Sequence, residues 1–210
     1  MTEVDDAPPT DVMQMDPNVW GPPLWDTLFT LCFKCPPSTL SDVLTLFSLL
    51  EKVIPCQHCR RSYTMYRKQV RPSTTIKSEV PHSAAMWLWT IHDMVNQKLG
   101  KICINFDKLL QRHGAMTMLT NDMTVIDLYC IMAFSTRPAI APYVVQFINV
   151  VSRLSAHVPG LKIGKLSTNV RHDHLLDDLF EMHARVREAH DFRPLARAEF
   201  DAQYAVARAS

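Results

Sequence analysis

Apolar residues recur at spacings of three and four along most of this chain, and that pattern predicts a series of amphipathic helices. Trp25, Leu28, Phe29 and Cys32 follow this spacing and indicate a first helix over about residues 20–35. A second, more regular stripe is formed by Leu40, Val43, Leu44, Phe47, Leu50 and Val53. This stripe indicates a second helix with one face turned toward a core.

Prolines and a serine mark the ends of these helices. Pro36 stops the first helix, and Ser38 is a candidate N-cap of the second. Pro55 ends the second helix directly before Cys56. We therefore expect a third helix to open at Cys56 and to run to about Val70.

A fourth helix is expected after a loop. Pro72 and the Ser-Thr-Thr run at 73–75 mark the loop. Ser83 is a candidate N-cap for the fourth helix, and Gly100 suits its C-terminal end because glycine adopts the left-handed conformation without strain. A short fifth helix is expected over about residues 107–113.

The remainder of the chain predicts further helices, over about residues 123–135, 140–157, 173–190 and 194–208. No convincing alternation indicates a strand, and the chain has only 5 glycines, so we expect an all-α protein. We divide it into a flexible arm (1–17), a compact helical unit (18–114) and an additional helical C-terminal domain (115–210). Dimerisation and docking of a substrate protein are the roles considered for the last part.

Charge and hydropathy argue against two classes of partner. The 22 basic and 21 acidic residues leave a formal net charge of +1, so neither nucleic acid nor a membrane surface is an expected partner. No apolar run reaches the ~18 residues that a membrane helix needs. The acidic start of the chain has no features of a secretory signal or transit peptide. We therefore expect a cytoplasmic location, where thiols are kept reduced.

Cys56 and Cys59 form a Cys-x-x-Cys motif at the predicted start of the third helix. The N–H groups and dipole at a helix start favour a thiolate, and His58 adds positive charge when it is protonated. In a reducing compartment, six cysteines favour metal or redox chemistry over a structural disulfide framework. The motif therefore indicates a redox-active disulfide.

Other interpretations compete with this one. The two cysteines could be buried and inert. Cys32 and Cys35 form a second Cys-x-x-Cys motif, with 20 residues between Cys35 and Cys56, which is a spacing typical of a four-cysteine zinc site. The chain could then be a zinc-stabilised helical interaction module that uses Cys32, Cys35, Cys56 and Cys59. The helical pattern around Cys32 disfavours zinc, and the absence of strands disfavours a thioredoxin-like protein.

Three short motifs occur in order in the first half of the chain. They are Trp-Gly-Pro-Pro-Leu-Trp at 20–25, Pro-Cys-x-x-Cys at 55–59 and His-Asp-Met-Val-Asn-Gln-Lys-Leu-Gly-Lys at 92–101. Each motif alone is weak evidence for a protein family, but the three motifs in this order are specific evidence. Together they resemble the Erv/ALR family of FAD-dependent sulfhydryl oxidases over roughly residues 18–114.

The resemblance implies a four-helix bundle with a short fifth helix that binds FAD beside Cys56 and Cys59. It implies that Cys56 exchanges with substrate thiols and that Cys59 contacts the flavin. Electrons would pass from a dithiol through Cys56–Cys59 to FAD and then to molecular oxygen, producing hydrogen peroxide. The expected protein is thus a homodimeric, FAD-linked thiol oxidase that forms disulfide bonds in thiol-containing substrate proteins.

The predicted fourth helix also has residues suited to a planar ligand. Trp89, His92 and Asn96 are spaced by three and four and share one helical face. Lys98 and Lys101, at the helix end, suit phosphates. By family position, the expected FAD-binding residues are Trp20, Gly21, Trp25, Phe29, Ile54, Trp89, His92, Val95, Asn96, Lys98, Lys101 and Arg112.

The sequence departs from the family pattern at several of these positions. Phe29 stands where the family usually has histidine, so one flavin hydrogen bond is missing or supplied elsewhere. Asp93 replaces an asparagine, and His113 replaces a tryptophan. Trp89 takes the place of a cysteine that forms a structural disulfide in many cellular members. That loss resembles the members encoded by large DNA viruses, which would place the protein in the host cytoplasm and in the virion.

The remaining cysteines offer no recognisable shuttle. Cys32 and Cys35 lie three residues apart inside a predicted helix, which is poor disulfide geometry, so we expect free thiols. Pairing of Cys103 with Cys130 is left open. The Arg-His-Asp-His run at 171–174 is expected to be a solvated helix start, and no metal site is predicted.

Overall fold

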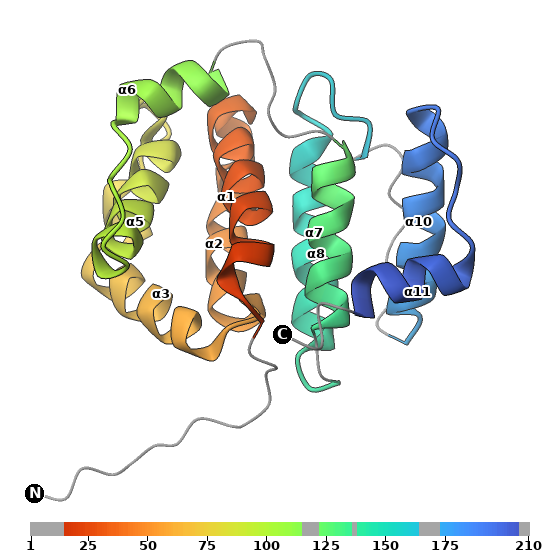
Figure 1. Ribbon diagram of the computed structural model, residues 1–210. Helices are drawn as coiled ribbons and strands as arrows, with labels where there is room; N and C mark the ends of the chain where they lie inside the picture. The colour runs from red at the N-terminus through yellow and green to blue at the C-terminus, as the bar shows by residue number, and fades with distance from the viewer. Residues whose placement is uncertain (1–14, 115–121, 136–137, 164–172, 206–210) are drawn as a thin grey trace, which may run out of the picture.

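The computed structural model describes residues 15–114, 122–135, 138–163 and 173–205, and all regular structure within these ranges is helical (Figure 1). The long helices are α1 (Pro17–Lys34), α2 (Leu40–Val53), α3 (Gln57–Gln69), α5 (Ser83–Lys98), α7 (Asp122–Phe134), α8 (Ala141–Ser155), α10 (Leu175–Ala189) and α11 (Arg197–Ala205). Shorter segments are η1 (Pro37–Thr39), α4 (Pro72–Thr75), α6 (Phe106–Leu109) and the π-helical turn η2 (Leu110–Gly114). The all-α prediction is confirmed, and the described ends of the long helices lie within three residues of their expected bounds, whereas the expected end of the last helix at 208 lies outside the described residues.

The first helix begins three residues earlier than expected. The carboxylate of Asp16 accepts a hydrogen bond from the backbone N–H of Asn18 (2.9 Å). Pro17 occupies the first helical position, where its missing N–H is not needed. This combination of an acidic cap and a proline starts α1 ahead of its first buried apolar residue.

Met15 is part of the packed structure rather than of a flexible arm. Its side chain is buried, and its backbone N–H donates to the carbonyl of Pro55 (3.2 Å). Its own carbonyl accepts a hydrogen bond from the indole of Trp20 (3.3 Å). The expected arm of residues 1–17 is therefore wrong from Met15 onward, and residues 1–14 lie outside the described part of the chain.

Three expectations about loops and caps are also wrong. Residues 72–75, expected as a loop, form α4, because Pro72 suits a first helical turn. Ser38 lies inside η1, which Pro37 begins, and does not cap α2. Ser83 is the first residue of α5 rather than its cap, and its hydroxyl instead donates to the carbonyl of Lys77 (2.7 Å).

The end of α5 is as predicted. Gly100 has φ +64°, a left-handed conformation that favours glycine. Its N–H donates to the carbonyl of Gln97 (3.1 Å), and the N–H of Lys101 donates to that of Asn96 (2.9 Å). These two bonds form a Schellman cap, which satisfies carbonyls that the helix end leaves open.

The helices α1, α2, α3 and α5 enclose the core of the first half (Figure 1). The rings of Phe47 and Trp87 lie 4.4 Å apart between α2 and α5. Leu46 and Ile91 are fully buried beside them, and each such side chain stabilises the fold by about 1.5–3 kcal/mol. The hydroxyl of Tyr63 donates to the carbonyl of Phe47 (2.8 Å) and ties α3 to α2.

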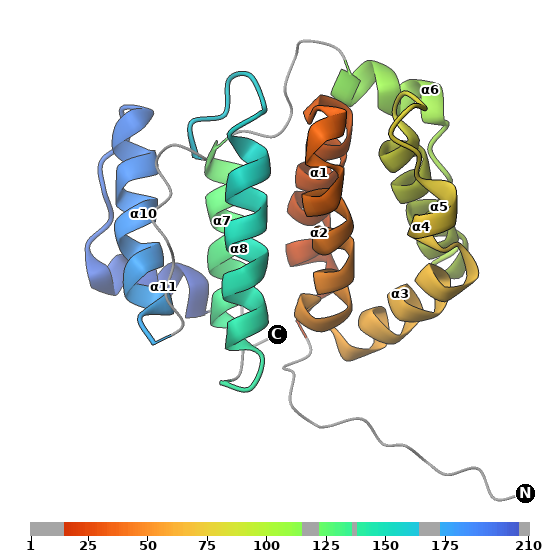
Figure 2. The same cartoon turned by 180° about the vertical axis from the view of Figure 1, so that it is seen from behind.

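The second half of the chain covers the other face of α1 and α2. α7 packs along α1 and α8 along α2, with α10 and α11 beyond α7 (Figures 1 and 2). The guanidinium of Arg153 lies 2.8 Å from the carboxylate of Asp42 across this boundary. The buried apolar side chains of both halves form one continuous cluster, and the division into domains at residue 115 stays a prediction.

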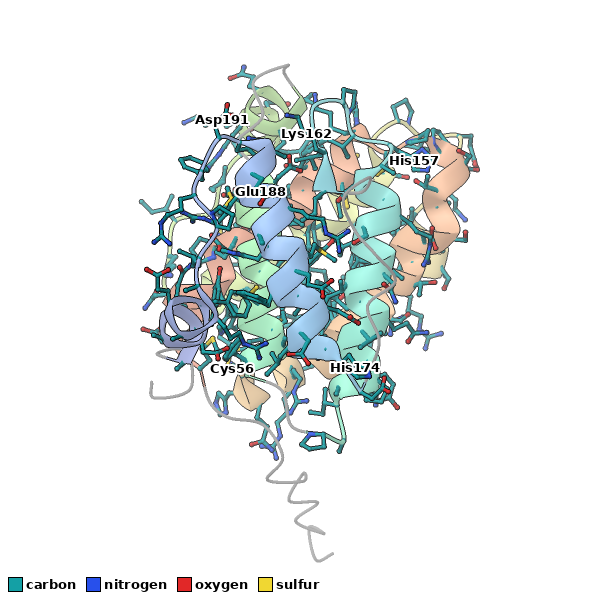
Figure 3. The ribbon with its side chains drawn as sticks, turned by 90° about the vertical axis from the view of Figure 1, so that its right-hand side faces the viewer. Cys56, His157, Lys162, His174, Glu188 and Asp191 are labelled. Carbon is teal, nitrogen blue, oxygen red and sulfur yellow. A yellow bond between two sulfur atoms is a disulfide. The ribbon has the colours of Figure 1, made fainter. Side chains whose placement is uncertain are left out.

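A buried carboxylate closes the far end of the second half. Asp122 is 1% exposed and accepts hydrogen bonds from the backbone N–H groups of Lys162 (2.8 Å) and Ile163 (2.7 Å). His190 lies 2.8 Å from its other oxygen. Lys162 lies at the end of the molecule opposite Cys56 (Figure 3). Among the described helices, none has the length and apolar character needed to cross a membrane.

Candidate functional site

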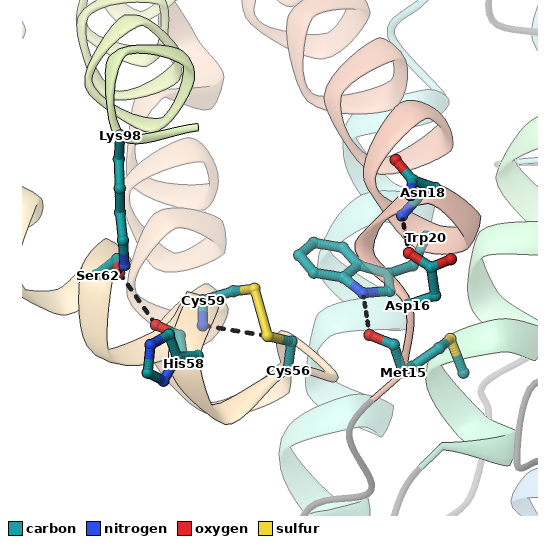
Figure 4. The surroundings of a disulfide bond; sticks show 9 residues. All are labelled: Met15, Asp16, Asn18, Trp20, Cys56, His58, Cys59, Ser62 and Lys98. Atoms are coloured by element: carbon teal, nitrogen blue, oxygen red, sulfur yellow. Dashed lines mark hydrogen bonds between the residues drawn. A yellow bond between two sulfur atoms is a disulfide. The ribbon is translucent and has the colours of Figure 1, made fainter. Parts of the chain in front are cut away.

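Cys56 and Cys59 form a disulfide at the start of α3, with their Cα atoms 5.2 Å apart. Pro55 lies between the end of α2 and the start of α3, and Cys56 takes the N-cap position of α3. Its Sγ accepts a hydrogen bond from the backbone N–H of Cys59 (3.2 Å), as Figure 4 shows. Cys56 is 7% exposed, whereas Cys59 is half-buried.

This position prepares Cys56 for thiol–disulfide exchange. When the bond is reduced, a thiolate at Cys56 faces the positive end of the α3 dipole and keeps the N–H of Cys59 as a hydrogen-bond donor. Both effects stabilise the thiolate over the thiol, which makes Cys56 a good leaving group. The disulfide is therefore placed for redox chemistry by local structure alone.

An apolar cavity of about 310 Å³ lies against the disulfide. It falls in the size range of small-molecule sites, which are mostly apolar with a few polar groups. The indole of Trp20 lies beside the two sulfurs (Figure 4). The lining residues are Pro17, Trp20, Leu24, Trp25, Leu28, Leu50, Ile54, Cys56, His58, Cys59, Ser62, Tyr63, Val95, Lys98 and Leu99.

The rim of the cavity carries its polar groups. The ammonium of Lys98, at the end of α5, donates a hydrogen bond to the hydroxyl of Ser62 in α3 (2.6 Å). The Ser62 hydroxyl in turn donates to the carbonyl of His58 (3.0 Å). The rim is thus cationic, while the interior is lined by hydrocarbon, indole and sulfur.

Part of the predicted cofactor-binding set lines this cavity. These residues are Trp20, Trp25, Ile54, Val95 and Lys98. The others do not line it: Gly21, Phe29, Trp89, His92, Asn96, Lys101 and Arg112. The structure therefore gathers five of the expected residues around the disulfide.

His92 lies directly behind the cavity wall. Its ring centroid is 4.5 Å from that of Trp25 and 5.7 Å from that of Phe29. Burial lowers the pKa of His92 to about 4, so the ring is neutral at pH 7. No residue of the described chain forms a hydrogen bond with this ring, which leaves one N–H donor and one acceptor available.

Phe29 occupies the place of the family histidine without replacing its polar group. It is 2% exposed, and its ring lies 5.5 Å from that of His113. His113 belongs to η2 and is buried, and its Nδ1 lies 3.4 Å from the hydroxyl of Thr30. Burial lowers the pKa of His113 as well. This pair therefore fills space with neutral aromatic rings.

Trp89 packs against the segment that follows α5, and its contact with a cofactor stays a prediction. Its indole donates to the carbonyl of Ile104 (2.6 Å), and its ring packs edge-on against Phe106 at 5.9 Å. It thus anchors the segment between α5 and α6. The guanidinium of Arg112 lies 3.5 Å from the carboxylate of Asp26, at the surface.

Two predicted residues differ in their surroundings near the end of α5. Asn96 is buried, and Lys101 is exposed just beyond the helix cap. Gly21 is buried in α1, yet a Cβ added there would meet no atom within 4 Å apart from its chain neighbours and the backbone of its own helix. The space beside Gly21 is therefore open for a ligand to approach the backbone.

Several cavity residues were not expected from the sequence. Leu24, Leu28 and Leu50 belong to the apolar stripes of α1 and α2, so periodicity places them on the buried face. Periodicity does not separate a side chain that fills a core from one that walls a cavity. Tyr63 has the same ambiguity on α3.

The four other cysteines are free thiols, as expected for Cys32 and Cys35. Burial raises the pKa of Cys32 far above its usual value and that of Cys35 to about 12, so both stay protonated. They line a separate cavity of about 290 Å³ beside residues 77–84. Cys103 is exposed and Cys130 is fully buried, and the two are not bonded to each other.

This placement argues against the zinc alternative. A four-cysteine site needs four converging thiolates, whereas Cys32 and Cys35 line a different cavity from the Cys56–Cys59 disulfide. No group of three His, Cys, Asp or Glu residues in the described ranges is arranged to hold a metal ion. Of the Arg-His-Asp-His run, residues 171 and 172 lie outside those ranges, and His174 stands at the N-cap of α10 without capping it.

The comparisons with known proteins concern the first half of the chain. Residues 22–113 match the profile of the Erv1 / Alr family. FAD-linked sulfhydryl oxidase ERV1 of Arabidopsis thaliana is 25% identical over 100 residues, which are 46% of this chain and 50% of that protein. The chain thus spans half the length of this curated relative. No solved structure matches the chain significantly.

The residues around the disulfide fit a flavin ring. Two indoles and several aliphatic side chains form an apolar cavity with one wall made by the disulfide. His92 and Asn96 each have a side chain without a hydrogen-bond partner in the described chain, and Lys98 places a positive charge at the rim. Aromatic stacking, a few hydrogen bonds and a cation are what a planar heterocycle with phosphates requires.

Proposed function

We propose that this protein is an FAD-dependent thiol oxidase that forms disulfide bonds in substrate proteins. The observation that carries the proposal is the Cys56–Cys59 disulfide in the wall of an apolar cavity flanked by Trp20 and Trp25. A structural disulfide needs no such cavity, and an apolar ligand site needs no disulfide. The matched relative is named as an FAD-linked sulfhydryl oxidase, which supports the same activity here.

The proposed reaction at the cysteines is a two-step exchange. A substrate thiolate attacks Sγ of Cys56, breaks the Cys56–Cys59 bond and forms a mixed disulfide, while Cys59 leaves as a thiolate. A second substrate thiolate then attacks the substrate sulfur of the mixed disulfide and releases Cys56 as a thiolate. The substrate loses two electrons and two protons, and the pair Cys56–Cys59 gains the two electrons.

The hydrogen bond from the Cys59 N–H assists the second step. It stabilises the thiolate that leaves, because Cys56 Sγ already accepts this bond in the disulfide form. Cys59 lies in the first turn of α3 at the same cavity wall. On the strength of the family resemblance, we assign substrate exchange to Cys56 and contact with the flavin to Cys59, although both line the cavity and Cys56 is the more buried of the two.

The cavity would hold the flavin ring of FAD between the disulfide and the indoles of Trp20 and Trp25. His92 and Asn96 supply neutral polar groups behind the wall, and Lys98 supplies charge for the phosphates. Bound FAD would supply a two-electron acceptor that restores the Cys56–Cys59 disulfide and is itself reoxidised by molecular oxygen, giving hydrogen peroxide. Lys101 and Arg112 are exposed, so we assign them to the outer part of the cofactor.

We extend the proposal to the setting of the enzyme on the strength of the family resemblance alone. The enzyme is proposed to be of the type encoded by large DNA viruses and to act in the host cytoplasm as a homodimer. The faces of α1 and α2 that do not enclose the bundle core are covered by α7 and α8 of the same chain. A homodimer would therefore have to use another surface.

An oxygen electrode tests the activity. With dithiothreitol as substrate, the purified full chain should consume oxygen and release one hydrogen peroxide per disulfide formed. Added catalase should return half of the consumed oxygen, because it converts two peroxides to one oxygen. Oxidation of dithiothreitol no faster than in buffer would reject the proposal.

A further inference from the structure

The segment that carries the redox pair has an unusual charge distribution for a chain of net charge +1. Between Glu51 and Glu79 there is no acidic residue. The basic residues in that interval are Lys52, Arg60, Arg61, Arg67, Lys68, Arg71 and Lys77. The excess of positive charge is therefore concentrated in the segment around α3 rather than spread over the chain.

Four side chains form an exposed stripe along α3, starting at the redox motif. His58, Arg61, Met65 and Lys68 are spaced by three, four and three residues, so they lie on one helical face. All four are exposed, and Met65 leaves 48% of its surface accessible. We name this the α3 stripe. It joins cationic groups to an adaptable apolar side chain, a combination suited to binding a polypeptide.

A groove connects this stripe to the disulfide. It has a volume of about 250 Å³ and is lined by His58, Arg61, Ser62, Met65 and Lys98. Three of these residues, His58, Ser62 and Lys98, also line the cavity that contains Cys56 and Cys59. A polypeptide in the groove would thus reach the disulfide.

Glu51 and Asp16 do not neutralise the stripe. Glu51 pairs with Arg67 (2.9 Å), which is not part of the stripe. The Asp16 carboxylate caps α1 and lies on the other side of Trp20 from the disulfide (Figure 4). Arg61 and Lys68 have no ion-pair partner among the described residues.

We propose that the α3 stripe and its groove dock a substrate polypeptide that is acidic beside its reactive cysteine. This inference rests on the proposed function and names the substrate class of the same site. Acidic side chains on the substrate would meet Arg61 and Lys68, while Met65 would contact its apolar groups. The attacking thiolate is itself an anion, so the cationic groove also favours its approach.

The test measures reduction of the Cys56–Cys59 disulfide by dithiol peptides under argon, in stopped flow with the full chain. Three Cys-x-x-Cys peptides carry two aspartates, two glutamines or two lysines beside the cysteines. Each second-order rate constant is divided by that of dithiothreitol with the same variant. Wild type is compared with Arg61→Glu plus Lys68→Glu, and the control is Arg185→Glu on α10, far from α3 (Figure 1).

We expect wild type to react with the aspartate peptide about tenfold faster than with the lysine peptide at low salt, with the difference shrinking as salt screens the charges. The double variant should reverse the order, and Arg185→Glu should preserve it. Comparing each peptide across variants cancels its intrinsic thiol reactivity.

Equal normalised rates of the wild-type protein with the three peptides would overturn the inference, and so would an unchanged order of the peptide rates in the double variant. Binding of duplex DNA to the α3 stripe at physiological salt, together with no preference among the peptides, would also overturn it. Deletion of residues 2–14, which contain Glu3, Asp5, Asp6 and Asp11, tests the remaining occupant. If the deletion accelerates the reaction of the protein with all three peptides equally, the stripe binds the chain's own acidic segment and the inference also fails. Failure of oxygen consumption with dithiothreitol, by contrast, would reject the proposed oxidase while leaving these exchange rates measurable.

Discussion

The ammonium of Lys98 donates a 2.6 Å hydrogen bond to the hydroxyl of Ser62, which joins the end of α5 to α3 at the rim of the cavity. The same hydroxyl donates to the carbonyl of His58, so Ser62 holds three residues together. Because the two helices are distant in sequence, this contact helps to fix the width of the cavity mouth.

Ser62→Ala should lower the free energy of unfolding by about 1–2 kcal/mol, since it removes one neutral hydrogen bond and one charge-assisted hydrogen bond to the solvent-exposed Lys98. Urea unfolding of the flavin-free protein measures this change. Ser48→Ala on α2 is the control, because the Ser48 hydroxyl binds the already paired Arg67. An effect of Ser62→Ala no larger than that of Ser48→Ala would show that the rim contact is not stabilising.

Gly21→Ala should affect cofactor binding more than the stability of the flavin-free protein. Alanine favours a helix over glycine by about 0.5–1 kcal/mol, but a Cβ on the residue before Pro22 disfavours the helical conformation, so the two effects oppose each other and the stability should change little. If the flavin approaches the Gly21 backbone as proposed, the methyl group should weaken retention of FAD several-fold. Thermal unfolding and the flavin-to-protein absorbance ratio give the two values. Unchanged FAD retention would remove Gly21 from the cofactor site.

The cysteines should separate into two classes. Cys56→Ser and Cys59→Ser should each reduce oxygen consumption with dithiothreitol by at least about 100-fold, because each removes one sulfur of the exchanging pair. Cys32→Ser should retain most of the activity, since its thiol is buried and protonated away from the cavity. Loss of turnover on protein substrates but not on dithiothreitol in Cys32→Ser would instead identify Cys32 and Cys35 as a shuttle.

His183 should make the second half of the chain sensitive to acid. Burial lowers its pKa to about 4, and its Nε2 is buried without a hydrogen-bond partner in the described chain. A histidine in the unfolded chain titrates near 6.5. As the pH falls from about 6.5 to about 4, the unfolded state binds a proton that the folded state does not, so the free energy of unfolding falls.

His183→Leu should remove this contribution. Between pH 7 and pH 5, the variant should lose about 1–2 kcal/mol less stability than wild type, as measured by urea unfolding at each pH. Phe200 and Tyr204 pack on the His183 ring, so a packing change in the variant shifts its free energy of unfolding by the same amount at every pH and leaves the pH-dependent difference intact. Parallel stability profiles for the two proteins would contradict the prediction.

The redox motif could be predicted because its determinants are local. Pro55 ends one helix, the next begins at Cys56, and a spacing of three residues brings Cys59 within bonding distance. Gly100 likewise follows from local backbone conformation. Met15 could not be predicted, because its burial depends on contacts with Pro55 and Trp20 that no sequence pattern announces.

The cavity wall was predicted only in part for a similar reason. Periodicity places Leu24 and Leu50 on buried faces, but the distance between α1 and α3 decides whether they meet other side chains or a cavity. The hydrogen bond from the indole of Trp89 to the carbonyl of Ile104 could not be predicted either, because it depends on how the segment after α5 folds back.

An anaerobic titration of the purified full chain tests the central claim most directly. The account predicts a yellow protein whose flavin absorbance band bleaches on addition of dithiothreitol, and a Cys59→Ser variant that stays yellow under the same treatment. A colourless protein that carries stoichiometric zinc, or a wild-type flavin band that dithiothreitol does not bleach, would contradict it.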